Sequence, residues 1–346
     1  MRDTIYVVLL NFRGWSDTVA CLESLLASED VKMRVIVCDN ASGDGSLDRI
    51  EDWARGDIEA ERPGEPRLAR LLGRFRRPLQ YQRLDREEAE SGRALVDAPL
   101  VLVDNGENLG FAAGNNVGLR LAMAQEDMAY AWLLNNDTLV EPGCLAAMRG
   151  ALKERSDKAV CGSVIHFFDR PEVIQALGGN RFNRLTGIAA QSEGRFLDES
   201  EPYCPAATAR RLAYVSGCSM LLPRRFLEEV GLMDEDYFLY YEEIDWFTRA
   251  DNRFPPCIAP KAHLYHREGS AIGSPGWKRR ATAFADYHLY RSRFLFMKKH
   301  YFSRLPVCIL AAILESGKCL LRGQLANVRA VFMAMTRPNL AWRPGP

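Results

Sequence analysis

The N-terminal half of the chain alternates short apolar runs with amphipathic stretches. Four runs rich in β-branched and apolar residues predict buried strands at residues 4–10, 34–38, 99–103 and 131–134. Apolar residues at helical spacing follow the first run, over residues 15–27, and the third run, beyond residue 108. Strands that alternate with helices predict an α/β fold with an open, mostly parallel sheet flanked by helices.

The pattern changes in the middle and later parts of the chain. Residues 55–98 are rich in Arg, Glu and Pro and poor in periodic apolar residues, which predicts a charged, partly helical surface insertion. The runs 159–168 and 212–222 predict further strands, and residues 262–273 predict a loop that carries His and Gly. From residue 287 onward the pattern favours helix.

Charge divides the chain more clearly than composition does. The 346 residues are 47% hydrophobic, which is ordinary for a globular protein and excludes disordered and collagen-like chains. From residue 291 to the end, ten Lys and Arg stand against the single acidic residue Glu315. Residues 1–290 carry 35 basic and 44 acidic residues, so a segment of net charge −9 precedes a tail of +9. We therefore expect an α/β domain over residues 1–285 and a basic, amphipathic helical segment over 286–346.

The basic tail is interleaved with apolar and aromatic residues. This pattern is typical either of a helix that contacts an anionic membrane surface or of a solvated helical face. The apolar stretch 306–314 is too short to span a bilayer, and residues 1–10 are too short an apolar run for a signal peptide. The acidic remainder of the chain and the lack of a nucleic-acid-binding motif disfavour nucleic acid as a partner.

Nine cysteines, an odd number with no C-x-x-C pair, favour a reducing compartment over a disulfide scaffold or a structural zinc site. We therefore expect a cytoplasmic protein. The tail leaves open a peripheral position at the inner face of the cell membrane.

Polar residues follow three of the predicted strands, where ligands bind in open α/β sheets. Asp39 could accept the imino N–H of uracil or thymine, although Asp39 taken alone is better explained as a simple turn aspartate. The Gly- and Asn-rich run 108–116 could let a nucleotide approach the backbone, or form an ordinary glycine turn. Asp137, next to the neutral oxygens of Asn135 and Asn136, could bridge Mg²⁺ or Mn²⁺ to a diphosphate, or end a turn.

Two further groups of residues could take part in catalysis. The run 237–246 (YFLYYEEIDW) packs aromatic residues against Glu242 and Glu243, which would raise a carboxylate pKa as a general base requires. An acidic helix N-terminus is the structural alternative, and it suits Asp245 better. His263 and His266 lack partners at zinc spacing, so a zinc site is disfavoured. One of them could join Asp137 on a catalytic divalent ion, and a structural hydrogen-bonding histidine is the alternative.

Taken in order, these motifs resemble glycosyltransferase family 2, with its GT-A nucleotide-diphospho-sugar transferase fold, and in particular its bacterial rhamnosyltransferase-like subgroup. The resemblance covers residues 5–273 and rests on six segments: VVLLNFRGWSDTVACLESLL, VIVCDNASGDGS, NLGFAAGNNVGLR, WLLNNDTLVEPG, VSGCSMLLPRRFLEEVGLMDEDYFLYYEEIDW and HREGS.

The resemblance implies a role for each matching residue. The nucleotide would be held by Asn11, Asp39, Asn108, Gly110, Asn115 and Asn136. Asp137 matches the last carboxylate of the metal-binding aspartate motif, and His266 matches the metal-ligating histidine, so the implied cofactor is Mg²⁺ or Mn²⁺. Glu243 matches the catalytic base and Glu242 its acidic neighbour. This chain departs from the pattern in having asparagines where many members have aspartates, and Glu at 243 where Asp is commoner.

The implied reaction is an inverting sugar transfer from a nucleotide-sugar donor to a hydroxyl of a saccharide or lipid-linked saccharide, as in cell-surface polysaccharide synthesis. The subgroup favours dTDP-L-rhamnose as donor, followed by a UDP-sugar. Two other classes remain open: a degenerate transferase that acts as a non-catalytic binding partner, and a nucleotidyltransferase.

Overall fold

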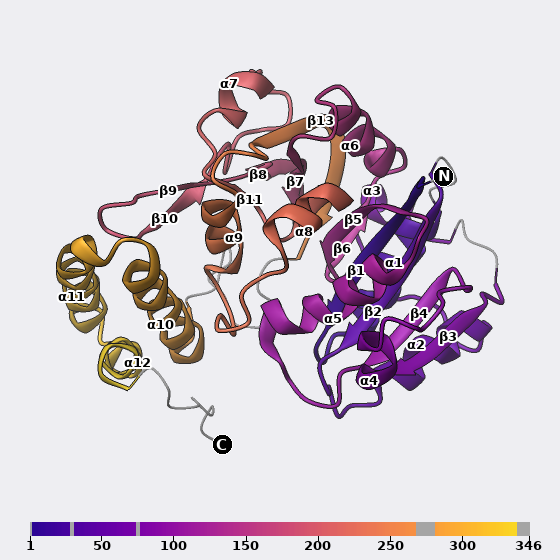
Figure 1. Cartoon of the computed structure of the whole chain (residues 1–346), viewed down its shortest axis with the longest axis horizontal. Coiled ribbons are helices and arrows are strands. Elements are labelled where there is room, and N and C mark those ends of the chain that lie inside the picture. Colours follow the sequence, from indigo (N-terminus) through magenta and orange to yellow (C-terminus); the bar gives the residue numbers. More distant parts are fainter. Residues whose placement is uncertain (1, 28–30, 74–76, 268–280, 338–346) are drawn as a thin grey trace.

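The computed structural model describes residues 2–27, 31–73, 77–267 and 281–337. A ten-stranded sheet dominates the molecule (Figure 1). Its strand order is β3-β4-β2-β1-β5-β12-β7-β13-β6, with β8 paired to β7. The strands of the large sheet are β1 (Thr4–Asn11), β2 (Met33–Asp39), β3 (Tyr81–Asp85), β4 (Leu100–Asp104), β5 (Met128–Asn135), β6 (Thr138–Val140), β7 (Val160–Phe167), β8 (Arg170–Leu177), β12 (Ser219–Pro223) and β13 (Pro256–His266). A smaller sheet has the order β10-β9-β11. Its strands are β9 (Gly179–Phe182), β10 (Ala189–Ser192) and β11 (Tyr214–Val215).

Helices cover both faces of the large sheet and form a group at the C-terminal end of the described chain. The longer helices are α1 (Trp15–Leu26), α2 (Ser46–Arg55), α5 (Gly110–Ala124), α6 (Cys144–Lys153), α8 (Arg224–Val230), α9 (Glu242–Ala250), α10 (Ala283–His300), α11 (Leu305–Leu321) and α12 (Leu325–Thr336). The short ones are α3 (Pro66–Ala69), α4 (Arg86–Glu90), α7 (Pro205–Ala209) and the 3₁₀ turn η1 (Phe302–Arg304).

Alternate residues of the central strands point into two separate hydrophobic cores. In β1, Val7 and Leu9 pack with α1, α2 and α6 on one face, whereas Tyr6 and Val8 pack with α5, α8 and α9 on the other. Burial on both faces explains why these strands read as continuous apolar runs. The α/β prediction, with an open, mostly parallel sheet flanked by helices, is therefore confirmed.

The parallel pairing brings the carboxyl ends of several strands to one edge of the sheet. Asn11 pairs with Asp39 across β1 and β2, and Leu10 pairs with Asn135 across β1 and β5. Strand β12 then runs antiparallel to β5, so that its first residue, Ser219, pairs with Leu134 near the same edge. Residues far apart in sequence meet here, and the candidate site is built at this edge.

Several local predictions need correction. Within the predicted insertion 55–98, residues 81–85 form β3, an edge strand parallel to β4, so this segment extends the sheet. The predicted loop 262–273 is strand as far as His266, and its residues beyond 267 lie outside the described part of the chain. The run 212–222 forms two strands in different sheets, β11 and β12.

The C-terminal helices pack together at the far end of the molecule from β3 and β4 (Figure 1). Helix α12 contacts α10 and α11, around a small core that includes Tyr287, Ala312 and Val331. Phe296 and Met297 of α10 belong instead to the core beneath α9. Helix α10 therefore joins the C-terminal helices to the sheet domain.

Candidate active site

Asn11 and Asp39 form the centre of a buried polar network. Asn11 Nδ2 donates to Asp39 Oδ1 at 2.5 Å, and Ser42 donates to the same carboxylate through its hydroxyl at 2.6 Å and its backbone N–H at 2.9 Å. Asn11 is fully buried and Asp39 is 4% exposed. The predicted nucleotide residues at the ends of β1 and β2 are therefore in direct contact.

Asn136 extends this network from the end of β5. Its Nδ2 donates to Thr18 Oγ1 at 2.9 Å and to Asn11 Oδ1 at 3.2 Å, and the Thr18 hydroxyl itself donates to Asn11 Oδ1. Helix α1 supplies Thr18, so the first turn of this helix is tied to the ends of two strands, β1 and β5. The structure thus brings together Asn11, Asp39 and Asn136, as the sequence predicts.

The glycine-rich run packs closely against the segment that leads into α9. Gly110 has a φ of +78°, and a Cβ there would lie 2.2 Å from the backbone oxygen of Phe238, which also accepts the N–H of Phe111. Only glycine fits such a position. Packing alone therefore requires this glycine, whatever it does for a ligand.

Asn40 fastens the same run to the end of β2. Its Nδ2 donates to the Gly110 carbonyl at 2.9 Å and approaches Asn108 Oδ1 at 3.4 Å. Asn115 is buried within α5, where its Nδ2 donates to the Phe111 carbonyl one turn earlier. Asn108 and Gly110 thus lie beside the network, whereas the hydrogen bond of Asn115 is internal to its helix.

Asp137 and His266 face each other across the turn after β5 and the end of β13. Nε2 of His266 lies 3.2 Å from Asp137 Oδ1 and 3.3 Å from Asn135 Nδ2, and both side chains are almost buried. His266 Nδ1 lies 2.9 Å from Gln175 Oε1. Since a glutamine oxygen can only accept, Nδ1 carries the proton and Nε2 is left to face the carboxylate.

The pKa of His266 is raised well above its usual value. Burial alone would lower it, but the neighbouring Cys218 and the Asp137 carboxylate outweigh burial and favour the cation. A positive charge between Nε2 and Asp137 is therefore stabilised, and a divalent ion would satisfy the same pair. An imidazole whose other nitrogen is held by a hydrogen bond is the usual form of a metal ligand. No group of three or more His, Cys, Asp or Glu side chains suited to a metal ion occurs among the described residues.

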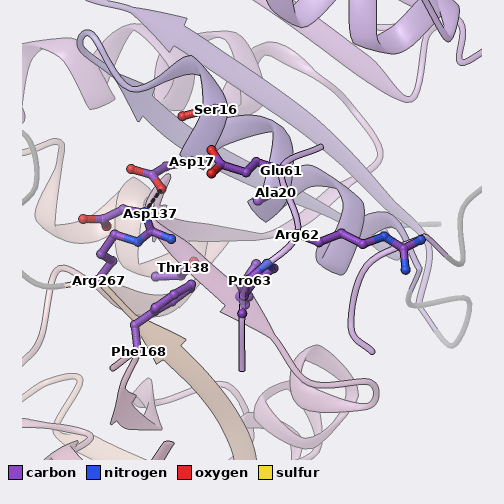
Figure 2. A pocket seen from close by; sticks show the side chains of 12 residues that line it. Ser16, Asp17, Ala20, Glu61, Arg62, Pro63, Asp137, Thr138, Phe168 and Arg267 are labelled. Carbon is purple, nitrogen blue, oxygen red and sulfur yellow. Dashed lines mark ion pairs between the residues drawn. The ribbon is translucent and has the colours of Figure 1, made fainter. Parts of the chain in front are cut away.

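A polar pocket of about 160 Å³ opens beside Asp137 (Figure 2). Its walls are the start of α1, the segment 61–64, the start of β6 and Arg267 directly after β13, and Figure 2 shows Asp17, Glu61 and Arg267 around it. Arg267 forms an ion pair with Asp17 at 3.3 Å and lies over the ring of Phe168. The predicted insertion 55–98 therefore supplies one wall of the space next to Asp137.

Glu242 and Glu243 begin α9 but lie in different surroundings. Glu243 is half-buried, and its Oε1 accepts the backbone N–H of Gly217 at 3.0 Å. Glu242 is 3% exposed, and its Oε2 has no hydrogen-bond partner among the described residues. The pKa of each is raised, chiefly by burial, and the charge of Glu243 raises that of Glu242 further. Glu243 can thus be the carboxylate that loses its proton first.

The loop before β12 connects the carboxylate pair with the Asp137–His266 pair. Gly217 donates to Glu243, and the next residue, Cys218, accepts the backbone N–H of Asn135 at 2.9 Å and lies beside His266. A Cβ on Gly217 would lie 2.3 Å from Glu243 Oε1. Two adjacent residues therefore separate the candidate base from the candidate metal ligands.

Sequence reasoning did not single out Gln175, Gly217 or Arg267 as site residues. Gln175 is on β8, about ninety positions before His266, and no local pattern indicates their contact. Arg267 directly follows the candidate metal ligand His266, so its position in the sequence could have indicated that it lies near the site. Gly217 stands in the quoted segment VSGCSMLL, where its need for a small residue depends on Glu243.

Comparisons with known proteins define the class of fold. Residues 86–231 match the model of Glycosyl transferase family 2. The mannosyltransferase PcManGT from Pyrobaculum calidifontis, solved with GDP-Man and Mn²⁺, is 14% identical with a TM-score of 0.50, and the alignment covers 98% of this chain and 87% of that one. GalNAc-T7, solved with UDP, GalNAc and Mn²⁺, is 12% identical with a TM-score of 0.55 over 97% of this chain and 56% of that one. The protein has the GT-A glycosyltransferase fold.

Curated relatives match a shorter part of the chain. An uncharacterized protein of Mycobacterium tuberculosis is 34% identical over 136 residues, which is 39% of this chain and 44% of that protein. The low-salt glycan biosynthesis hexosyltransferase Agl10 of Haloferax volcanii is 24% identical over 153 residues, 43% of this chain and 45% of the relative. The chain thus spans less than half the length of the curated relatives it matches.

Proposed function

We propose that this protein is an inverting glycosyltransferase that moves a sugar from a nucleotide-diphospho-sugar to a hydroxyl of a saccharide or lipid-linked saccharide. One observation carries the proposal: Glu243 and the Asp137–His266 pair meet at consecutive residues, Gly217 and Cys218, beside the Asn11–Asp39 network. A base, a pair of side chains that can bind a cation and a polar region beside them for the nucleotide are the parts that such a transfer needs.

The chain's own residues suggest the following division of work. Glu243 takes the proton of the acceptor hydroxyl, and the N–H of Gly217 holds its carboxylate in place. Asp39 accepts the imino N–H of the base, which favours a uridine or thymidine nucleotide. The N–H groups at the starts of the helices near the strand ends favour the diphosphate.

Asp137 and His266 would hold Mg²⁺ or Mn²⁺, with Gln175 fixing the imidazole. When bound, such an ion supplies charge neutralisation for the departing diphosphate. The Mn²⁺ recorded with the mannosyltransferase and with GalNAc-T7 supports this assignment. Two protein ligands suffice because hard divalent ions commonly take the rest of their coordination from phosphates and water.

For the donor we favour dTDP-L-rhamnose and place a UDP-sugar second. The pathway we propose is cell-surface polysaccharide synthesis, in the cytoplasm or at the inner face of the cell membrane. The two rivals are a degenerate transferase that only binds partners and a nucleotidyltransferase. The buried carboxylate oxygen of Glu242, which has no hydrogen-bond partner among the described residues, favours catalysis, because holding it there costs stability that a binding protein has no need to lose.

Thermal unfolding of the purified chain with Mn²⁺ and UDP, dTDP, GDP or CDP tests the proposal. Ligand at one hundred times its Kd adds about 2.7 kcal/mol to the free energy of unfolding, which is a clear shift in Tm. We expect a shift with dTDP or UDP that Asp137→Ala reduces and Glu243→Gln retains. The absence of a shift with all four nucleotides, with and without metal, would refute the proposal and favour the non-catalytic alternative.

A further inference from the structure

The outward face of α11 is apolar, which is unusual for a helix at a protein surface. Its exposed large side chains are all aliphatic: Val307, Leu310, Ile313, Leu314, Leu320 and Leu321. Lys318 is the only exposed charged residue of the helix. Positions 307, 310, 314 and 321 lie on one side of the helix, so these residues form an apolar stripe that Gly317 and Lys318 interrupt between Leu314 and Leu321.

The stripe continues onto the neighbouring elements. Phe302 of η1 is 69% exposed, and Leu325 and Phe332 of α12 are 67% and 64% exposed. The buried residues of α11 are Cys308 and Ala312, so the helix packs against the rest of the protein through small side chains. We define the lipid-facing surface as the exposed apolar residues of η1, α11 and α12. Nothing else in the described chain covers it.

Basic residues surround this surface. Exposed Lys318, Arg322, Arg329 and Arg337 take part in no ion pair within the described residues. The one carboxylate of α11, Glu315, is engaged by Arg293 of α10 at 2.7 Å. The charge available beside the apolar surface is therefore wholly positive, which selects an anionic partner and disfavours a second copy of the same basic surface.

We propose that α11 and α12 dock this protein onto an anionic lipid bilayer, with the lipid-facing surface inserted into the headgroup region and the basic residues against the phosphates. An apolar face bordered by Lys and Arg is the pattern of a helix that lies in a membrane interface. No helix in the described part of the chain is both long and apolar enough to cross a membrane. Helix α11, of 17 residues, would instead lie along the surface.

Docking would also orient the candidate active site. Ser292 of α10 donates to the Leu239 carbonyl at 2.8 Å, and Lys299 and His300 contact Asp245 of α9 at 2.9 and 2.6 Å. The segment that carries Glu242 and Glu243 is thus held directly by α10, and α10 in turn packs against the elements that carry the lipid-facing surface. If the proposed function holds, the base is fixed relative to the bilayer, which suits an acceptor whose sugar is anchored in lipid.

Vesicle co-sedimentation of the full chain tests the membrane surface without any enzyme assay. We expect the chain to bind vesicles of phosphatidylglycerol and phosphatidylcholine, to bind phosphatidylcholine alone far less, and to be released as salt is raised. Replacing Lys318, Arg322 and Arg329 together by Gln is expected to weaken binding to anionic vesicles on the order of a hundredfold.

Two exposed leucines, one on the lipid-facing surface and one elsewhere, test whether vesicle binding depends on this surface or on any exposed apolar side chain. Leu314→Glu removes one residue of the lipid-facing surface, whereas Leu95→Glu changes a similarly exposed leucine (63% and 70%) elsewhere in the molecule. We expect Leu314→Glu to weaken partitioning roughly tenfold and Leu95→Glu to leave it unchanged. Because both positions are exposed, both variants should keep the Tm of the parent.

Two results would overturn the inference. One is failure of the parent chain to bind anionic vesicles at low salt. The other is a concentration-dependent dimer that Leu314→Glu dissociates while vesicle binding stays unchanged, which would make the surface an interface between copies. Neither result depends on whether the chain transfers sugar, so the nucleotide-binding test of the proposed function remains separate.

Discussion

Two adjacent glutamates illustrate how surroundings separate like residues. Glu243 reaches solvent and receives the N–H of Gly217, whereas Glu242 is buried with an oxygen that lacks a partner in the described structure. The charged form of Glu242 is therefore the more costly of the two, and the pair shares its protons unequally. Each glutamate should consequently respond differently to removal of its charge.

For Glu243→Gln we expect the turnover number to fall roughly 10²- to 10⁴-fold, because the base is lost, while donor binding stays nearly the same. Steady-state kinetics with nucleotide titration would measure both quantities. A comparable loss of donor affinity would contradict the assigned role. Glu243→Asp, which keeps the carboxylate but withdraws it by one methylene, should recover part of the activity.

The pH dependence of stability should reveal Glu242. Its raised pKa means that the folded state favours the neutral form, so its contribution is fully present below the ordinary value of 4.5 and is lost as pH rises through the folded pKa. Glu242→Gln removes this loss. We therefore expect the Tm of the variant to exceed that of the parent by a few degrees at about pH 8, with a smaller gain near pH 5. A gain that is independent of pH would argue against a buried charge.

The residues that lie at strand ends were predictable because parallel pairing places them together. Asn11, Asp39 and Asn136 are examples, since each follows an apolar run that the sequence shows plainly. Gln175 was not predictable, because its contact with His266 depends on how β8 folds back on β7. The roles of all these side chains toward a ligand remain predictions.

At the scale of elements, α5 shows that glycines can serve packing in a segment that suggests ligand binding. A Cβ on Gly114 would lie 2.6 Å from Leu10 Cδ1, and one on Gly118 would lie 2.6 Å from Val8 Cγ1. The helix therefore sits closely on β1 and β2, and its small residues set that distance. The sequence predicted a helix that contains these glycines, but it could not show which surface the glycines approach.

Alanine substitution distinguishes glycines that packing requires from a glycine that packing does not require. Gly114→Ala and Gly118→Ala should each lower the free energy of unfolding by about 1–3 kcal/mol, because the added methyl overpacks the sheet. Gly150→Ala is the control: it lies in α6 with nothing within 4 Å of the added Cβ. This change should stabilise the protein by about 0.5–1 kcal/mol. Urea unfolding monitored by circular dichroism measures all three, and a similar effect at all positions would contradict the packing argument.

The charged segment 55–98 contains a strand that the sequence pattern did not predict. Its residues lack an apolar run, so the sequence favoured a surface insertion, yet residues 81–85 pair with β4 over five positions. An edge strand needs only one neighbour and can keep exposed polar side chains, which removes the periodic signal. The hydrophobic pattern detects buried strands far better than it detects edges.

At the scale of the whole molecule, one buried carboxylate links α9 to the C-terminal helices. Asp245 is fully buried and contacts Arg249, Lys299 and His300. Burial would raise its pKa, but the hydrogen bonds from His300, Lys299 and Arg249 lower it well below the ordinary value. Its structural role agrees with the alternative that the sequence favoured for this residue.

Asp245→Asn should destabilise the protein by about 1–3 kcal/mol, because the partly exposed Arg249 and Lys299 lose the buried carboxylate that accepts their hydrogen bonds. In the parent, the contribution of Asp245 is present above pH 3.8 and is lost as pH falls through the lowered folded pKa. The deficit of the variant in Tm should therefore shrink in acid. A Tm equal to that of the parent at neutral pH would show that α9 and α10 are held chiefly by their apolar contacts.

The edge strand β3 has a consequence for the behaviour of the protein at high concentration. Its outer side offers backbone groups to which a strand of another copy could add, as in edge-to-edge aggregation. The strand is only five residues long, however, and exposed Arg83 and Asp85 would have to be stripped of water by the incoming chain. Arg83 is also engaged by Asp48 and Glu51 of α2. The charged side chains that removed the apolar pattern of β3 thus also disfavour pairing of another strand with this edge, which favours solubility.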